Sequence, residues 1–431
     1  MTASQPSREP RLPPRQNGLE VFARSTPYPQ GPSKLTRHLP MPWKRRMRCG
    51  LLSIYSLTIA LASGCGVPPT PDASTPLTRV TPTSNPEASP SFEAAGGWEE
   101  LSEPSAQGRV SSVGAITNDG AAFWGGGTSQ DATDLADGAL FDVAGRSWSR
   151  IPSAPIGPRS SPVVAWTGNE LIVWGGFQPG SESASDDGAR YNPRTNVWTT
   201  LPLSPIPGRI GAWTGDSFLV VSTVPDADAT RLTAATWDPS SDGWQLGAEI
   251  RMPSGHDPAW AWTGTELVVF LYGDDIAVGP AGARYDPHED AWTPTAPSPV
   301  DPLNTPPAFW VGDEVYVLSG ASSAARGMAA NAAYDPALDA WRAIEGPNAS
   351  GFSLTEPPPA ATNRGVFFFG NRPIEYIVAS NVWLPAPPAP NGPRRIPGAA
   401  PAAGGGVVVW GGVTEPGQPA LSSALLYETP D

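Results

Sequence analysis

Lysine is almost absent from this sequence of 431 residues, since Lys34 and Lys44 are the only two. The chain from residue 65 onward therefore lacks the amine on which Schiff-base chemistry and phosphate-binding loops depend. Cysteine is just as scarce, with only Cys49 and Cys65, so the region after residue 65 has no disulfide, zinc cluster or cysteine nucleophile of its own. These absences exclude several classes of enzyme and leave packing as the source of stability.

Charged residues make up only 16% of the chain, and their signs are segregated. Residues 1–64 carry ten Lys and Arg against two acids, a net charge of +8, whereas residues 65–431 carry 17 Arg against 39 acids, a net charge of −22. A surface of that charge repels polyphosphates, so we expect no nucleic-acid partner and no direct attraction to anionic lipid. The 54 Pro and 46 Gly argue against a helical bundle.

The basic N-terminal region leads into a short apolar run. Residues 50–64, GLLSIYSLTIALASG, follow Lys44 and three arginines, and a run of about 15 residues is too short to span a bilayer. We therefore predict a signal peptide over residues 41–64. Residues 61–65, LASGC, resemble a bacterial lipobox, which implies that Cys65 is lipidated and anchors an extracytoplasmic protein to the membrane. A simple cleaved signal and an uncleaved anchor are the alternatives.

Two further N-terminal segments have no pattern typical of a folded core. Residues 1–40 are rich in Pro and Arg, which favours a disordered or over-extended N-terminus with translation starting at Met41 or Met47. Residues 65–96 combine Pro with many Ser and Thr, a composition too poor in apolar residues to fold. We predict that this second segment is a disordered tether.

A repeat fills the remainder, residues 97–431. Tryptophan recurs at 98, 148, 198, 244, 292, 341 and 383, with gaps of 50, 50, 46, 48, 49 and 42 residues. Most of these follow a turn of an aromatic residue, Asp or Asn, and Pro, as in Tyr191-Asn192-Pro193. Each unit also has an apolar run that ends in small residues, and four of these runs follow a Trp-Thr-Gly or Trp-Val-Gly phrase. Such short runs punctuated by Gly, Pro and Asp predict four strands per unit.

A four-stranded sheet repeated about every 48 residues predicts an all-β fold, a seven-bladed β-propeller. The units resemble those of the kelch family, in which a Gly-Gly pair follows the second strand and a Tyr and a Trp follow in turn; the pairs here begin at Gly125, Gly175 and Gly411. The last unit has no Trp strand, while Trp98 has no unit before it. We expect the strand of Trp98 to complete the seventh blade and close the ring.

Candidate binding residues lie before the innermost strands, on the face that also bears the longest and least similar loops. Counting back 16 residues from each Gly-Gly pair gives Arg109, Arg159 and Arg395, in three neighbouring blades. One interpretation is an arc of cations that binds a carboxylate or another anion. The other is that these arginines brace the backbone. Arg209 and His256 lie close to the same level and complete the candidate ligand-binding set.

Acidic loops before Gly138 and Gly188 raise the possibility of calcium. Their spacing does not match an EF-hand, and we expect solvated loops and no bound metal. The tryptophans at repeat spacing are expected to be structural wedges between blades.

Catalysis has little support in the sequence. The resemblance extends to galactose oxidase-like copper enzymes, which need two His, two Tyr and a Cys; the folded region has only His256 and His288 and no Cys, so copper radical chemistry is nearly excluded. We expect no catalytic residues and no cofactor. The prediction is a monomeric, lipid-anchored scaffold at the cell surface that binds a protein or glycan on the long-loop face, with a non-redox carbohydrate-active enzyme as the alternative.

Overall fold

The structure, a computed structural model, describes residues 96–429 apart from 105, 129–133, 227, 254, 256, 273–280, 301–306, 319–330, 347–358 and 370–372. These residues belong to the second of two compact units, Ser84–Asp431. The predicted N-terminal extension, signal peptide, lipidated Cys65 and tether up to residue 95 lie outside the described residues. The described part of the chain contains no helix that is long and apolar enough to cross a membrane.

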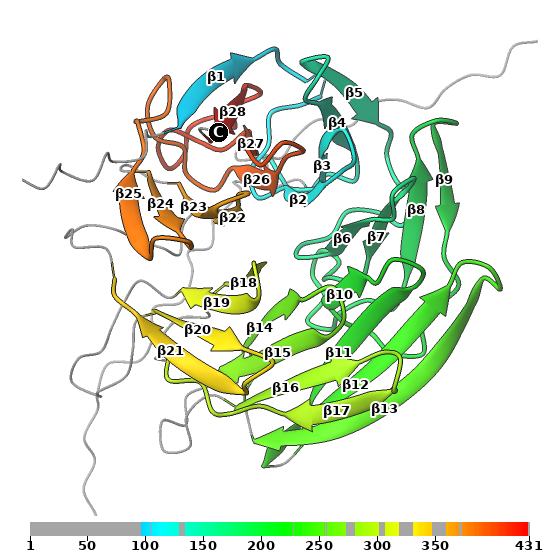
Figure 1. The fold of residues 1–431 in the computed structure, drawn as a ribbon. Helices are drawn as coiled ribbons and strands as arrows, with labels where there is room; N and C mark the ends of the chain where they lie inside the picture. The colour runs from blue at the N-terminus through cyan, green and yellow to red at the C-terminus, as the bar shows by residue number, and fades with distance from the viewer. Residues whose placement is uncertain are drawn as a thin grey trace, which may run out of the picture. The chain divides into compact units, whose positions relative to one another are not determined.

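All regular elements in the described residues are strands, and they form seven four-stranded antiparallel sheets arranged as a ring (Figure 1). From the inner strand outwards, blade one has β2 (Val113–Ile116), β3 (Gly120–Trp124), β4 (Gly138–Asp142) and β5 (Ser147–Ile151). Blade two has β6 (Val163–Trp166), β7 (Leu171–Trp174), β8 (Gly188–Asn192) and β9 (Val197–Thr200). Blade three has β10 (Ile210–Trp213), β11 (Phe218–Asp226), β12 (Ala229–Asp238) and β13 (Gly243–Pro253).

The same order continues around the ring. Blade four has β14 (Asp257–Trp262), β15 (Leu267–Tyr272), β16 (Ala281–Asp286) and β17 (Ala291–Pro294). Blade five has β18 (Ala308–Val311), β19 (Glu314–Leu318), β20 (Asn331–Asp335) and β21 (Ala340–Ile344). Blade six has β22 (Ala360–Ala361), β23 (Gly365–Phe368), β24 (Ile374–Ile377) and β25 (Val382–Pro385). Blade seven has β26 (Gly398–Pro401), β27 (Val407–Trp410) and β28 (Ala424–Glu428), and its outer strand is β1 (Gly97–Leu101). The prediction of an all-β, seven-bladed propeller is confirmed.

The second strand of a blade is buried on both of its faces. Every residue of β3, β7 and β27 is buried. Because side chains alternate along a strand, Ala121 and Phe123 pack toward blade seven, while Ala122 and Trp124 pack toward blade two. The continuous apolar runs in the sequence are therefore strands sandwiched between two neighbouring sheets.

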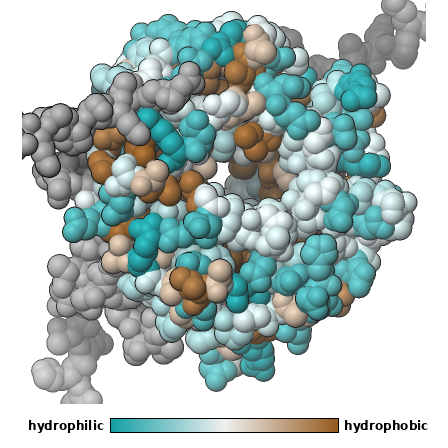
Figure 2. Space-filling model, viewed as in Figure 1, coloured by the Kyte–Doolittle hydropathy of each residue, from teal (hydrophilic) through white to brown (hydrophobic). Residues whose placement is uncertain are grey.

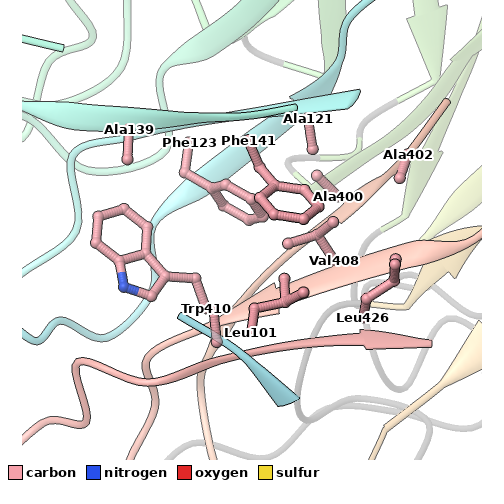
Figure 3. Packing of buried hydrophobic residues seen from close by; sticks show 11 residues of the cluster. Leu101, Ala121, Phe123, Ala139, Phe141, Ala400, Ala402, Val408, Trp410 and Leu426 are labelled. Atoms are coloured by element: carbon pink, nitrogen blue, oxygen red, sulfur yellow. The ribbon is translucent and has the colours of Figure 1, made fainter. Parts of the chain in front are cut away.

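Seven hydrophobic clusters result, one at each joint between neighbouring blades. Figure 3 shows the cluster between blades seven and one, where Phe123 and Phe141 meet Val408 and Trp410. The rings of Phe123 and Trp410 lie edge to face with centroids 5.9 Å apart. The core of the molecule is thus a ring of separate interblade layers.

The turn between the third and fourth strands explains the repeated Tyr-Asx-Pro phrase. In blade two, the Tyr191 hydroxyl donates to Asn196 Oδ1 at 2.8 Å, and Asn196 has a left-handed backbone with φ of 56°. Asn and Asp tolerate that conformation better than other residues with side chains. The same bond, from the aromatic residue to the Asn or Asp five positions later, recurs at Trp237–Asp242, Tyr285–Asp290, Tyr334–Asp339 and Tyr376–Asn381.

The repeat-spaced tryptophans join each blade to the one before it. Trp198 lies in blade two, and its indole Nε1 donates at 2.8 Å to the carbonyl of Pro152, which follows the outer strand of blade one. Five more such interblade indole bonds, between 2.7 and 3.0 Å long, run from Trp244 to Pro202, Trp292 to Ala248, Trp341 to Ala296, Trp383 to Glu345 and Trp98 to Pro387. They satisfy the indole donors, most of which are part-buried, and link each blade to its neighbour.

Trp148, at the joint between blades seven and one, departs from this pattern. Its indole N–H is buried and has no partner within the described residues. The joint has other contacts instead, because the Trp148 and Trp410 rings pack at a tilt with centroids 5.8 Å apart, and the Arg109 guanidinium lies 4.2 Å from the centroid of the same Trp410 ring.

The strand β1 pairs with β28, so that Trp98 lies opposite Tyr427. The Gly96 amide donates to the Tyr427 hydroxyl at 3.1 Å, and that hydroxyl lies 3.3 Å from Glu375 Oε2 in blade six. Arg364 also donates to Glu375, at 2.7 Å. Burial, followed by the charge of Glu375, raises the pKa of Tyr427 to about 12, so the hydroxyl remains a donor at neutral pH.

We predict that Trp341→Phe lowers the free energy of unfolding by about 1 to 1.5 kcal/mol more than Trp148→Phe does. Both substitutions keep an aromatic ring, but only the first removes an interblade indole bond and leaves the Ala296 carbonyl without its donor. Urea titration of residues 96–431 monitored by circular dichroism measures the difference. Equal losses would mean that the indole bonds add nothing to ring packing.

Candidate binding site

The two faces of the ring carry different connections. On one face the first and second strands are joined by tight turns, such as residues 167–170 between β6 and β7. On the other face the second and third strands are joined by longer loops, such as residues 175–187 between β7 and β8. We name these the tight-turn face and the long-loop face.

A channel of about 820 Å³ runs between the innermost strands. Figure 2 shows the opening at the centre of the ring, with hydrophobic residues on part of its wall. Its described lining consists of Gly, Ala, Val, Ile, Pro, Phe and Trp residues from all seven inner strands or the residues beside them. A concave, mostly apolar site of this size is typical of ligand pockets.

Arg109 lies on the long-loop side of the inner strand of blade one, and its side chain is completely buried. Its Nη1 donates at 3.0 Å to the carbonyls of both Gly125 and Asp137, and its Nη2 donates at 2.9 Å to Asp137 Oδ1. Gly125 and Asp137 are the two ends of the loop between β3 and β4. Burial lowers the pKa of Arg109, while the charge of Asp137 opposes that shift.

Arg159 repeats this arrangement in blade two. Its Nη1 donates to the carbonyl of Gly175 at 3.2 Å and to Asp187 Oδ1 at 2.7 Å, and Nη2 donates to Asp187 Oδ2 at 3.1 Å. Gly175 and Asp187 are again the two ends of the loop between the second and third strands. The geometry favours the bracing interpretation for both arginines, since buried and fully bonded guanidinium groups do not face a ligand.

In blade seven, the residue count from the Gly-Gly pair predicted the wrong arginine. The buried residue is Arg394, whose Nη1 donates to the carbonyls of Gly411 at 3.2 Å and Ser423 at 2.6 Å, whereas Arg395 is exposed. Gly411 lies 17 residues after its arginine, compared with 16 in blades one and two. The extra residue lies in the glycine-rich turn 402–406, which is one residue longer than the turn 167–170. Burial lowers the pKa of Arg394 to about 10.

We name Arg109, Arg159 and Arg394 the arginine clamps. The glycine that starts each clamped loop cannot be replaced easily. Gly175 and Gly411 have φ of 66° and 76°, and a Cβ at either would lie 2.1 Å from a carbonyl oxygen of the neighbouring blade. Close contact between blades therefore requires the first glycine of the pair in blades two and seven, whereas Gly125 in blade one has only its positive φ of 72° to favour glycine.

The other predicted site residues lie elsewhere. Arg209 is half-buried, with its guanidinium 5.7 Å from the ring centroid of Phe177, and the position that corresponds to the clamps in blade three is Ile206. His256 lies outside the described residues. Beside it, at the start of blade four, the Gly255 carbonyl accepts at 2.6 Å from the hydroxyl of Thr230 in blade three, a neutral bond at the level of the clamps.

Asp137 and Asp187 were considered only as loop acids in the sequence, but they are the partners of two clamps. The signal was present in the spacing, because each lies 28 residues after its arginine. The described residues contain no group of three or more His, Cys, Asp or Glu side chains placed to hold a metal ion.

Substitution of adjacent arginines tests the clamp register. Arg394→Gln should lower the free energy of unfolding by about 2 to 3 kcal/mol, since it leaves buried carbonyls unpaired. Arg395→Gln should change it by less than about 0.5 kcal/mol, since that side chain is exposed. Thermal and urea unfolding of the two variants measure both effects, and the reverse order would contradict the assignment.

Comparison with known proteins found one matching family motif and similar solved structures. Residues 158–205, which include the clamp and the four strands of blade two, match the Kelch motif. A solved structure entitled "Structure of YjhT" is similar to this chain with a TM-score of 0.42 and 15% sequence identity, covering 75% of this chain and 96% of that one. No curated protein matches the sequence. The chain is thus a seven-bladed β-propeller whose second blade matches the Kelch motif.

Proposed function

We propose that the chain is a binding scaffold that recognises a protein or glycan through the long-loop face. The observation that carries the proposal is the set of three clamped loops in the neighbouring blades seven, one and two. Each clamp bonds both ends of its loop, so the loop starts and ends at fixed positions.

The three clamped loops have the same length and different sequences. The residues between the clamped ends are GGTSQDATDLA at 126–136, GFQPGSESASD at 176–186 and GVTEPGQPALS at 412–422. Equal length with fixed ends and variable content is what a recognition surface needs, because a preorganised loop loses less entropy on binding. The loops carry no Lys or Arg, so we propose a partner surface that is neutral or basic.

The alternative of a carbohydrate-active enzyme needs two carboxylates facing one cleft. The described lining of the central channel contains no carboxylate. The scaffold role therefore has the stronger support.

We also propose that the scaffold is exported and held at the membrane by a lipid on Cys65, through a flexible tether, and that β1 closes the ring. Support for the anchor comes from the basic segment, the apolar run and the LASGC sequence. Support for closure comes from the pairing of β1 with β28.

Replacement of residues 178–183 in the blade-two loop by a Gly-Ser sequence of equal length should abolish binding to hits on glycan and peptide arrays probed with residues 96–431. The fold should persist, because the clamp and both loop ends remain. A matched control is Arg395→Gln, which removes a charge on the same face outside this loop. Unchanged array binding by the loop variant would contradict the role of this face.

The anchor has a separate test. Cys65→Ala in the full chain should move the protein from the membrane fraction to the soluble fraction and abolish labelling by a fatty-acid analogue. Persistent labelling of the variant, or none of the parent protein, would rule out the lipid anchor.

A further inference from the structure

The tight-turn end of the channel has an aromatic half and a small-residue half. The inner strands of blades two to five each have a tryptophan at the position before or beside the tight turn, namely Trp166, Trp213, Trp262 and Trp310. The corresponding residues of blades six, seven and one are Ala361, Pro401 and Ile116. All seven line the channel. The aromatic residues therefore form a continuous arc over four neighbouring blades.

The arc continues into the channel. Trp260 lies two residues before Trp262 on β14, so both side chains point to the same side of the strand, and both are partly exposed. The alternate residues Ala259 and Ala261 are buried in the cluster between blades four and five. Phe309 adds a second ring on β18. Each of these rings packs partly against an interblade cluster, and the part of it that remains exposed lines the channel.

The polar groups at this site come mainly from the backbone. The described lining has no charged side chain and no hydroxyl, carboxyl or amide side chain. Each inner strand pairs only with the second strand of its blade, so the backbone groups along its other edge face the axis. The Trp166 indole N–H already donates to Asn118 Oδ1 at 3.1 Å. The site can thus stack against apolar rings and exchange a few hydrogen bonds with carbonyls.

We propose that this aromatic arc binds an uncharged proline-rich peptide in the polyproline II conformation. Pyrrolidine rings present flat apolar faces to indoles, and the carbonyls of a polyproline II chain have no internal partners and accept from N–H groups. The conformation is already formed in the free peptide, which lowers the entropic cost of binding. A six-residue segment is about 19 Å long, which suits a channel rather than a shallow patch.

A neutral sugar fits the same site less well. Sugar hydroxyls need polar side chains to exchange hydrogen bonds, and burying them against apolar residues without partners is unfavourable. The described lining offers none of these side chains.

The proposed site is also distinct from the long-loop face, so the two proposals can fail separately.

The test is titration of decaproline into the full chain, followed by tryptophan fluorescence and calorimetry. Trp262→Ala and Trp310→Ala should each raise Kd by at least about 10-fold. The matched control is Leu338→Ala, because Leu338 is 74% exposed on the outer turn of blade five, and its Kd should stay within about twofold of the parent value. The loop replacement at 178–183 should leave decaproline binding unchanged even where it abolishes array binding.

A gain-of-binding variant avoids dependence on destabilised proteins. Ile116→Trp would extend the arc into blade one, at a side chain that is 50% exposed and lines the channel. It should tighten decaproline binding by about threefold or more. Three results would each overturn the proposal. They are no binding at millimolar decaproline, equal Kd values for the parent and Trp→Ala proteins, and tryptophan-dependent binding of maltohexaose in place of decaproline.

Discussion

The apolar second strand of each blade must be covered on both faces, and the rest of the structure depends on this constraint. A single sheet cannot cover both faces of its own strand, so every blade needs two neighbours. Only a closed ring gives all seven blades two neighbours each. The alternation of side chains, with Phe123 toward blade seven and Trp124 toward blade two, distributes one strand between two interblade layers.

Tryptophan serves this ring in distinct ways according to its position. On the outer strands, as in Trp198, the indole bonds to the preceding blade and sets the joint. On the second strands, as in Trp410, the ring is completely buried in an interblade layer. On the inner strands, as in Trp262, the ring remains partly exposed at the channel. All three positions contribute to the interblade layers, and the third also leaves part of its aromatic surface at the channel.

The arginine clamps connect the scaffold to the long-loop face. A guanidinium group has enough donors in one plane to bond a carbonyl at each end of a loop and a carboxylate at the same time, as Arg159 does with Gly175 and Asp187. Blade seven uses Ser423 in place of the carboxylate, so Arg394 is held mainly by neutral oxygens. The loop ends are fixed in all three blades, while the loop sequences are free to differ.

The repeat predicted the number of blades and the strand order, because the periodic Trp, Tyr-Asx-Pro and Gly-Gly phrases each correspond to one strand or turn. The sequence was a poorer guide to which side chains occupy equivalent positions in different blades. Counting residues selected Arg395 because one additional residue in the turn 402–406 shifts the count in blade seven. The clamp partners Asp137 and Asp187 were not identified, since pairing across a loop depends on where its ends meet. The Trp-Thr-Gly phrases indicated turns, but only the closed ring places their tryptophans around one channel.

Closure of the ring by its N-terminal strand is the central claim, and truncation tests it most directly. Thermal unfolding of residues 96–431 should match that of the chain that includes the preceding tether. Removal of eight further residues, to leave 104–431, deletes β1 together with Trp98 and exposes β28 as an edge strand. We expect that protein to unfold at a markedly lower temperature and to aggregate. Equal unfolding temperatures and equal solubility for residues 96–431 and 104–431 would contradict the account.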